Sequence, residues 1–273
     1  KGAVLAEICV VFYASCSCIA YIRVFADYLP PLFEIVAPNI HFLQNPNLCM
    51  AGVMVLTFAL ASQKTLASGR IFSMCAVFGI GVTALVVFIE LMHNGVASDV
   101  VWGCKDTFVL SFPLFSVANT GHHNMLRVYK ELKDRDQGNR AYNAINLASL
   151  ICVTIYAFVG IAGYLALGEN TPDNILVAYT GTARTGFYFF LVNFSRLSLV
   201  FAIACSFKNP HYAVRTGIEN VFFSSTANEN TKRRIIITSM LVGSFLAIAM
   251  AIPSITSAFN FSGSTVGAVM VYF

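Results

Sequence analysis

The 273 residues are 57% hydrophobic and 11% charged, with a net charge of +4 and a mean hydropathy of +0.72. A soluble domain carries roughly 25% charged residues to cover its surface. The composition therefore excludes an ordinary soluble protein and predicts a chain that lies in a lipid bilayer.

Long hydrophobic segments follow one another along the chain. Transmembrane β-strands have about 10 residues with strict alternation, whereas these segments are longer and do not alternate. We therefore expect an all-α, polytopic membrane helix bundle, with one partial transmembrane domain over 1–273. Because the chain starts and ends inside apolar segments, we expect it to be truncated at both ends. The eight predicted segments are 3–26, 47–62, 71–92, 106–126, 143–167, 185–207, 234–252 and from about 259.

Proline, asparagine and glycine predict several segment boundaries. We expect Pro30 and Pro31 to close the first segment and Asn45 with Pro46 to open the second. Gly168 is expected to end the fifth segment.

Lysine and arginine are unevenly divided between alternate loops. The loops after the second, fourth and sixth segments carry twelve of them, and the other loops carry only Lys105 and Arg184. Since cytoplasmic loops are enriched in Lys and Arg, we expect these three loops to face the cytoplasm. Anionic lipid headgroups explain the charge without a nucleic-acid partner. The twelve residues are Lys64, Arg70, Arg127, Lys130, Lys133, Arg135, Arg140, Lys208, Arg215, Lys232, Arg233 and Arg234.

The fourth segment combines a proline with a run of polar residues. Pro113 removes a backbone donor, and the stretch from Ser116 through Ala118, Asn119, Thr120 and Gly121 weakens the following turn. Irregular backbone in a membrane survives only inside protein or along a cavity, and broken helices bind substrate in many transporters. One interpretation is a discontinuous helix whose Ser116–Gly121 stretch contacts substrate. The other is a kinked helix whose polar groups bond to neighbouring helices.

Polar residues in the first and sixth segments are further candidates. Ser17 and Tyr21 share a helical face with Tyr13 and either line a substrate pathway or pack in the ordinary way. Arg196 lies inside a membrane segment, where an unpartnered charge costs at least ~2.5 kcal/mol. It serves either as a gate or cation surrogate, or as a structural ion pair with a residue such as Glu7 or Glu90.

The histidines do not form a metal-binding pattern. His122 and His123 are adjacent and would point in different directions on a helix. We therefore expect no metal, no cofactor and no enzymatic activity. His122 is either a proton-coupling or pH-sensing residue or an ordinary hydrogen-bonded histidine.

Several stretches resemble the amino acid/auxin permease family, which includes sodium-coupled neutral and vacuolar amino acid transporters. "GHHNMLRVYKEL" resembles the end of that family's sixth helix, with Gly121 and His123 in place of the usual Cys and Pro. "GYLALGENTPDNIL", residues 163–176, resembles the end of the seventh helix and the following loop. The other matching stretches are "CIAYIRVFADYLP" at 18–30, "RLSLVFAIACSF" at 196–207 and "FNFSGSTVGA" at 259–268.

The resemblance implies that the eight segments are helices three to ten of an inverted-repeat bundle of five plus five helices. It implies a secondary active transporter that moves amino acids by alternating access, coupled to H⁺ or Na⁺. In the wider fold a hydroxyl on the eighth helix helps to hold sodium, which implies a coupling-ion role for Ser206, with Cys205 beside it. The implied location is the plasma membrane or a vacuolar or lysosomal membrane. The alternative function is an amino-acid sensor that keeps the binding site and signals through cytoplasmic loops.

Overall fold

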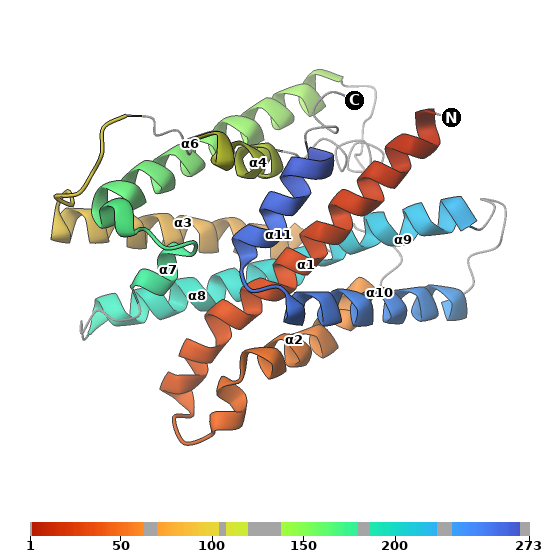
Figure 1. Ribbon diagram of the computed structural model, residues 1–273, viewed down its shortest axis with the longest axis horizontal. Helices are drawn as coiled ribbons and strands as arrows, with labels where there is room; N and C mark the ends of the chain where they lie inside the picture. Colours follow the sequence, from red (N-terminus) through yellow and green to blue (C-terminus); the bar gives the residue numbers. More distant parts are fainter. Residues whose placement is uncertain are drawn as a thin grey trace.

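The computed structural model describes residues 2–62, 70–103, 108–119, 138–179, 186–222 and 231–267, which form helices and connectors without a strand (Figure 1). The predicted all-α bundle is therefore confirmed. The helices are α1 (Gly2–Val36), η1 (His41–Gln44), α2 (Pro46–Ala61), α3 (Arg70–Asn94), α4 (Phe108–Asn119), α6 (Gly138–Leu167), η3 (Gly168–Asn170), α7 (Ile175–Ala178), α8 (Phe187–Ser206), α9 (Lys208–Phe222), α10 (Thr231–Ala251), α11 (Ile255–Ser262) and η4 (Gly263–Gly267), the last a π-helical turn.

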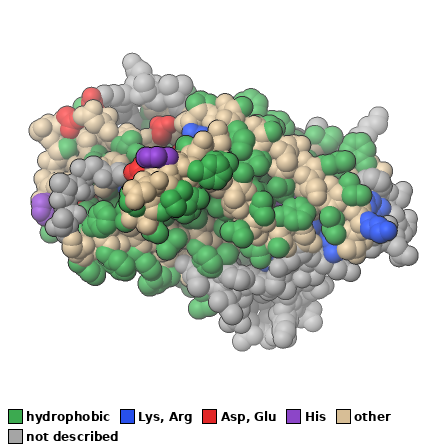
Figure 2. Space-filling view, turned by 90° about the horizontal axis from the view of Figure 1, so that it is seen from below, with side chains coloured by type: hydrophobic (Ala, Val, Ile, Leu, Met, Phe, Trp, Pro, Cys, Tyr) green, Lys and Arg blue, Asp and Glu red, His purple; other side chains and the backbone are tan. Residues whose placement is uncertain are grey.

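Each predicted hydrophobic segment contains a helix. Five described stretches are long and apolar enough to cross a membrane, and α2 is a shorter apolar helix. Large apolar side chains also cover the outside of the molecule, as Figure 2 shows for one face. Lipid is the solvent that such a surface requires, because patches this extensive are rare on soluble monomers. The chain is a multi-pass membrane protein.

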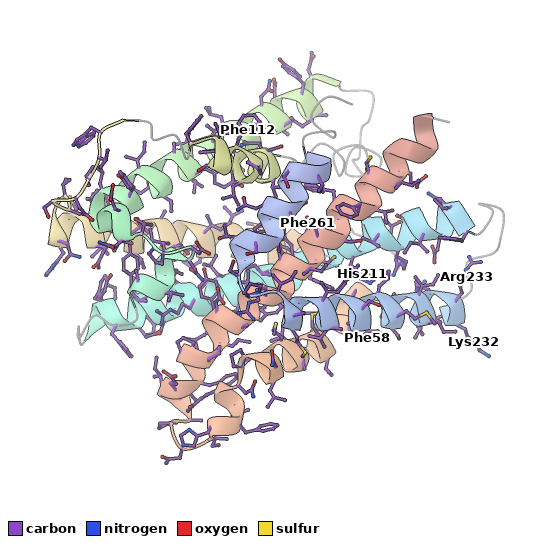
Figure 3. All side chains as sticks on the ribbon, viewed as in Figure 1. Phe58, Phe112, His211, Lys232, Arg233 and Phe261 are labelled. Atoms are coloured by element: carbon purple, nitrogen blue, oxygen red, sulfur yellow. The ribbon has the colours of Figure 1, made fainter. Side chains whose placement is uncertain are left out.

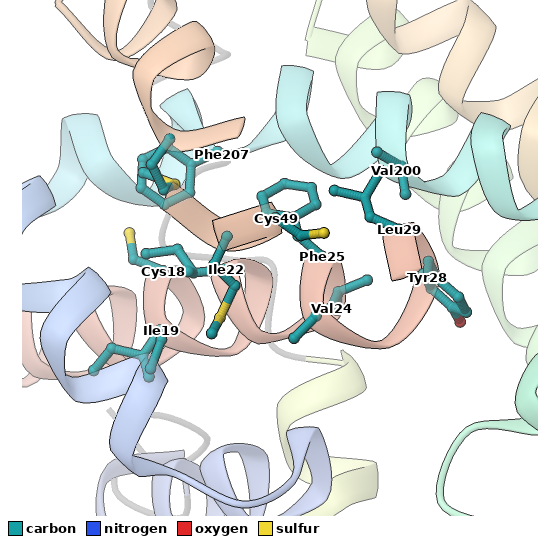
Figure 4. Close-up of a cluster of buried hydrophobic side chains, with 14 of the residues drawn as sticks. Cys18, Ile19, Ile22, Val24, Phe25, Tyr28, Leu29, Cys49, Val200 and Phe207 are labelled. Carbon is teal, nitrogen blue, oxygen red and sulfur yellow. The ribbon is translucent and has the colours of Figure 1, made fainter. Parts of the chain in front are cut away.

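The central element is α1, which crosses the bundle diagonally and packs against α2, α8, α9, α10 and α11 (Figure 1). Its residues Ile22, Phe25 and Leu29 are buried with Val200 of α8 and Phe207 beyond it (Figure 4). A long apolar helix that is buried along most of its middle part must lie inside a bundle. α1 therefore forms the scaffold on which the other helices are placed.

The boundary predicted at Pro30 and Pro31 is wrong. Both prolines lie inside α1, which continues to Val36. Proline removes a backbone hydrogen bond and favours a helix end, but Tyr28 and Leu29 are buried in the core and hold this part of α1 in place. Tertiary packing here outweighs the local preference.

The other predicted boundaries are confirmed. The side chain of Asn45 accepts a hydrogen bond from the backbone N–H of Asn47 (3.0 Å), and Pro46 is the first residue of α2. Gly168 follows the last residue of α6 and has a φ of 65°, a left-handed conformation that favours glycine. Local capping chemistry determines both of these ends.

The prediction of a loop after the sixth segment is wrong for the first part of that stretch, which forms helix α9 (Lys208–Phe222). Phe207 joins α8 directly to α9, which packs against α1 and α2. Lys208 and Arg215 are buried, and Arg215 Nη1 donates to the carbonyl oxygen of Ala61 (3.1 Å). The sequence predicts these two residues to be loop charges because they lower the hydropathy of the stretch that forms α9. In the structure they lie on its buried face. Lys232 and Arg233 do lie at the start of α10, at one end of the bundle (Figure 3).

Candidate functional site

A proline-containing helix meets a π-helical turn where α4 packs against α11 and η4. α4 contains Pro113 and ends at Asn119, and η4 is π-helical, a form that is frequent at functional sites. Gly263 packs directly on α4, because a Cβ at this residue would lie 2.2 Å from the carbonyl oxygen of Pro113. Two irregular helices thus touch at their irregular points.

The predicted substrate residues of α4 have different environments. Ser116 is half-buried, whereas Ala118 and Asn119 are exposed. Asn119 Nδ2 donates to the carbonyl oxygen of Phe115 (2.9 Å), so this side chain binds its own helix. Thr120, Gly121 and His122 lie outside the described residues, and the discontinuity expected there stays a prediction.

The α1 face that carries Tyr13, Ser17 and Tyr21, which forms one wall of the candidate site, is connected to α4 through Tyr13. The buried Tyr13 hydroxyl donates to the carbonyl oxygen of Val117 (3.0 Å) and so links α1 to the last turn of α4. Ser17 donates to the carbonyl oxygen of Tyr13 (3.1 Å), while Tyr21 is half-buried and packs against the main core. The structure thus brings Tyr13 to α4, whereas the hydrogen bond of Ser17 to Tyr13 stays within α1.

α11 packs against both α1 and α4 and adds residues that were not predicted for the site. Phe259 packs with Tyr13 and Val117, and Phe12 lies against Phe261, with ring centroids 5.9 Å apart. Figure 3 labels Phe112 on α4 and Phe261 on α11 and shows the two helices close together. The available signal was the polar, glycine-containing stretch "FNFSGSTVGA", which is unusual inside a hydrophobic segment.

The three walls carry no formal charge in their sequence. Residues 8–22, 108–119 and 255–267 contain no Asp, Glu, Lys or Arg. Hydroxyl, thiol, amide and carbonyl groups are the polar chemistry available there. Such groups can bind uncharged polar atoms or the charged ends of a zwitterion, but they do not compensate a further ionic side chain.

Arg196, the predicted gate or ion-coupling residue, is 3% exposed and holds the connector between α6 and α8. Arg196 Nη2 donates to the carbonyl oxygen of Leu176 (2.7 Å), and Nη1 donates to Asn193 (3.1 Å). The two carboxylates suggested as its ion-pair partners accept other bonds: Glu7 from Asn220, and Glu90 from Asn94 and Tyr188. The guanidinium therefore anchors α7 within the bundle.

The same connector, residues 171–179, is also bound to α1. The Tyr28 hydroxyl donates to Asn174 Oδ1 (2.8 Å), and Asn174 Nδ2 donates to Asp27 (3.4 Å). Tyr179 is buried at its end, and burial together with the nearby carboxylate of Glu90 raises the pKa of the Tyr179 hydroxyl. Tyr179 is consequently neutral at pH 7, and the connector is a segment bound to two helices.

Cys205 and Ser206 lie half-buried at the end of α8. The helical hydrogen bonds continue past them, since the Phe207 N–H donates to the carbonyl of Ile203 (2.9 Å) and the His211 N–H to that of Phe207 (3.3 Å). These two carbonyls are therefore used by the helix. The coupling-ion role expected of Ser206 and Cys205 stays a prediction.

Known proteins similar to this chain are membrane transporters by name. It is 23% identical to "Amino acid transporter AVT6E" of Arabidopsis thaliana over 96% of this chain and 57% of that protein. It is 25% identical to "Vacuolar amino acid transporter 6" of Saccharomyces cerevisiae (77% and 49%), and 24% identical to "Sodium-coupled neutral amino acid symporter 2" of Danio rerio (60% and 32%). The chain thus spans about half the length or less of these relatives. No solved structure matches it significantly.

The family profile gives the broadest match. The profile described as "Transmembrane amino acid transporter protein" covers residues 1–273, which is the whole chain. The sequence stretches that resembled the amino acid/auxin permeases lie within this match. The chain belongs to the transmembrane amino acid transporter protein family.

Proposed function

We propose that the full-length protein is a secondary active transporter that moves amino acids across a membrane by alternating access, coupled to H⁺ or Na⁺. The junction of α4, η4 and α1 is the observation that carries this proposal. A proline-containing helix and a π-helical turn meet inside a membrane bundle, where irregular backbone is tolerated only within protein or beside a cavity. The named transporter relatives support the same function.

The connector 171–179 supports a gating role for Arg196. Arg196 of α8 binds the connector at Leu176, and Tyr28 and Asp27 of α1 bind it at Asn174. These bonds hold the connector against both helices. A segment held by a few polar bonds can be released as a unit. We place the outer gate of the transport cycle at this connector, on the side predicted to face away from the cytoplasm.

Uptake of labelled amino acids by the full-length protein in proteoliposomes tests the function. We expect accumulation when an inward H⁺ or Na⁺ gradient is imposed and equilibration when it is removed. Absence of uptake for a broad panel of amino acids under both gradients contradicts the proposal.

Arg196→Gln tests the gate. We expect slower uptake with normal membrane insertion, because Leu176 loses its charged donor. Arg23→Gln is the matched control, since Arg23 Nη2 also donates to a carbonyl oxygen, that of Pro253 (3.0 Å), but away from the connector. Equal effects of the two substitutions would count against a gate at Arg196.

The coupling ion is proposed to contact Ser206 and Cys205. For Ser206→Ala we expect a weaker dependence of uptake on the driving ion, measured as a higher half-saturating ion concentration. The vacuolar and sodium-coupled relatives match two of the proposed settings, a vacuolar membrane and Na⁺ coupling. The sensor alternative gains no support from the comparisons, since these relatives are named transporters.

A further inference from the structure

Serine and threonine hydroxyls in the described helices commonly donate to the carbonyl oxygen four residues earlier. This bond satisfies the hydroxyl within its own helix and is the usual solution in an apolar environment. It leaves the hydroxyl with little need for a ligand. Examples are Ser15, Ser17, Thr154, Thr216, Ser239 and Ser244.

Ser262 does not follow this pattern. Its side chain is 1% exposed, and among the described residues its Oγ has only a thiol as a hydrogen-bond partner. The Cys16 thiol of α1 lies beside it, but a thiol is a weak hydrogen-bonding group. A buried polar group costs about 1–3 kcal/mol when it has no partner, and a thiol offsets only part of that cost, so this hydroxyl requires an explanation.

The position of Ser262 supplies the explanation. It is the last residue of α11, directly before Gly263, which packs on the backbone of Pro113 in α4. Thr238 on α10 is buried without a partner among the described residues, but it lies within a regular helix. At Ser262 the weakly partnered hydroxyl coincides with the junction that carries the transport proposal.

The surroundings of Ser262 limit the chemistry of a ligand. Cys16, Ala258 and Gly263 are small, and the nearby stretches of α1, α4 and α11 carry no formal charge. A hydroxyl can both donate and accept a hydrogen bond. A short, uncharged side chain with its own hydroxyl or amide fits these groups, whereas an ionic side chain would lack a counter-charge.

We propose that Ser262, with Cys16 beside it, forms the side-chain subsite for a small, uncharged polar amino acid such as serine. The Ser262 hydroxyl hydrogen-bonds to the polar atom of the substrate's side chain when α1 and α11 separate during transport. This inference rests on the proposed transport function and assigns the residue that sets its specificity.

Competing transport of serine and alanine tests the subsite. We expect the full-length protein in proteoliposomes to prefer serine, measured as the ratio of the two kcat/KM values. Ser262→Ala should lower kcat/KM for serine about 2- to 10-fold, the range for loss of one hydrogen bond, and leave alanine nearly unchanged. Ser262→Thr, which keeps the hydroxyl, should retain a preference for the hydroxylated substrate.

Two further variants complete the design. Ser244→Ala is the matched control, because Ser244 is exposed and donates to the carbonyl of Met240 (2.8 Å), so the serine-to-alanine ratio should not change. Ser262→Cys nearly preserves the side-chain volume, and it should lower the ratio even if the alanine variant fails to insert.

The outcomes separate the inference from the proposed function. A protein that transports no amino acid overturns both. A protein that transports only amino acids with charged side chains overturns the subsite and leaves the function intact. Equal losses for serine and alanine in the Ser262 variants indicate a structural role and also overturn the subsite.

Discussion

Two close helix contacts in this bundle are built from similar residues and differ in how their polar groups are satisfied. Where α3 meets α8, Gly79 allows close approach, and a Cβ at this residue would lie 2.8 Å from the Cβ of Ser198. One turn further, Thr83 and Ser195 are joined by a hydrogen bond of 2.8 Å. Thr83 also donates to the carbonyl oxygen of Gly79 (3.0 Å), which leaves Ser195 as the donor between the helices.

The junction of α4 with α11 and η4 also depends on a glycine, but its polar side chains are not all paired by strong hydrogen bonds. Gly263 lies against the backbone of Pro113, where no side chain can yield to relieve a clash. Ser262 next to it has only the weakly hydrogen-bonding Cys16 thiol as a partner within the described residues. The α3–α8 contact has the properties of a permanent seam, because small residues and paired hydroxyls stabilise membrane helix contacts. The α4–η4 junction has the properties of a site whose hydrogen bonds are completed by a bound ligand.

Of the substitutions that test this comparison, Gly263→Ala should lower the stability of the protein most. The added methyl group would overlap backbone atoms of Pro113, so we expect the free energy of unfolding to fall by about 3 kcal/mol. Thermal unfolding of the full-length protein in detergent measures the change. Gly243→Ala is the control: a Cβ at that residue meets nothing within 4 Å, so its Tm should be unchanged or slightly higher.

Thr83→Val should have the next largest effect and tests whether the α3–α8 seam is as complete as it looks. The substitution removes the acceptor of Ser195, which is fully buried, and we expect a loss of about 2 kcal/mol. Ser195→Ala should cost less, because Thr83 keeps its bond to Gly79. The double variant should be more stable than Thr83→Val alone; purely additive losses in thermal unfolding would contradict this assignment of donor and acceptor.

Tyr13→Phe removes one hydrogen bond next to the α4–η4 junction and leaves the α3–α8 contact unchanged. It leaves the carbonyl of Val117 without the Tyr13 hydroxyl, and we expect a loss of about 1 kcal/mol with slower transport. Tyr142→Phe on the exposed surface of α6 serves as its control and should change neither Tm nor uptake. Unchanged uptake in the Tyr13 variant would show that the link between α1 and α4 does not matter for transport.

Asn119→Ala should have the smallest effect on stability, below about 0.5 kcal/mol, because Asn119 is exposed and bonds to its own helix. If the end of α4 contacts substrate, uptake should nevertheless be weakened while membrane insertion stays normal. Wild-type kinetics in this variant would remove Asn119 from the proposed site.

The predicted site illustrates why some residues could be found from sequence and others could not. Pro113 and the polar run after it were visible, because such residues are rare in a lipid-exposed helix. Ser262 was less visible, because a serine near the end of a hydrophobic segment is common. What distinguishes it is its weak hydrogen bonding and the contact of the next residue, Gly263, with Pro113 of α4, about 150 positions away in the chain.

The sequence by itself determined the class of this protein and the helical ends that use local chemistry. Long apolar runs require helices in lipid, and the Asn45 cap and Gly168 act within a few residues of their own position. Only the tertiary structure decided that α1 continues through Pro30 and Pro31, that the basic residues of α9 are buried, and that α11 forms a wall of the candidate site. These features depend on packing between distant segments, and the free energy of that packing exceeds the local preferences of the residues involved.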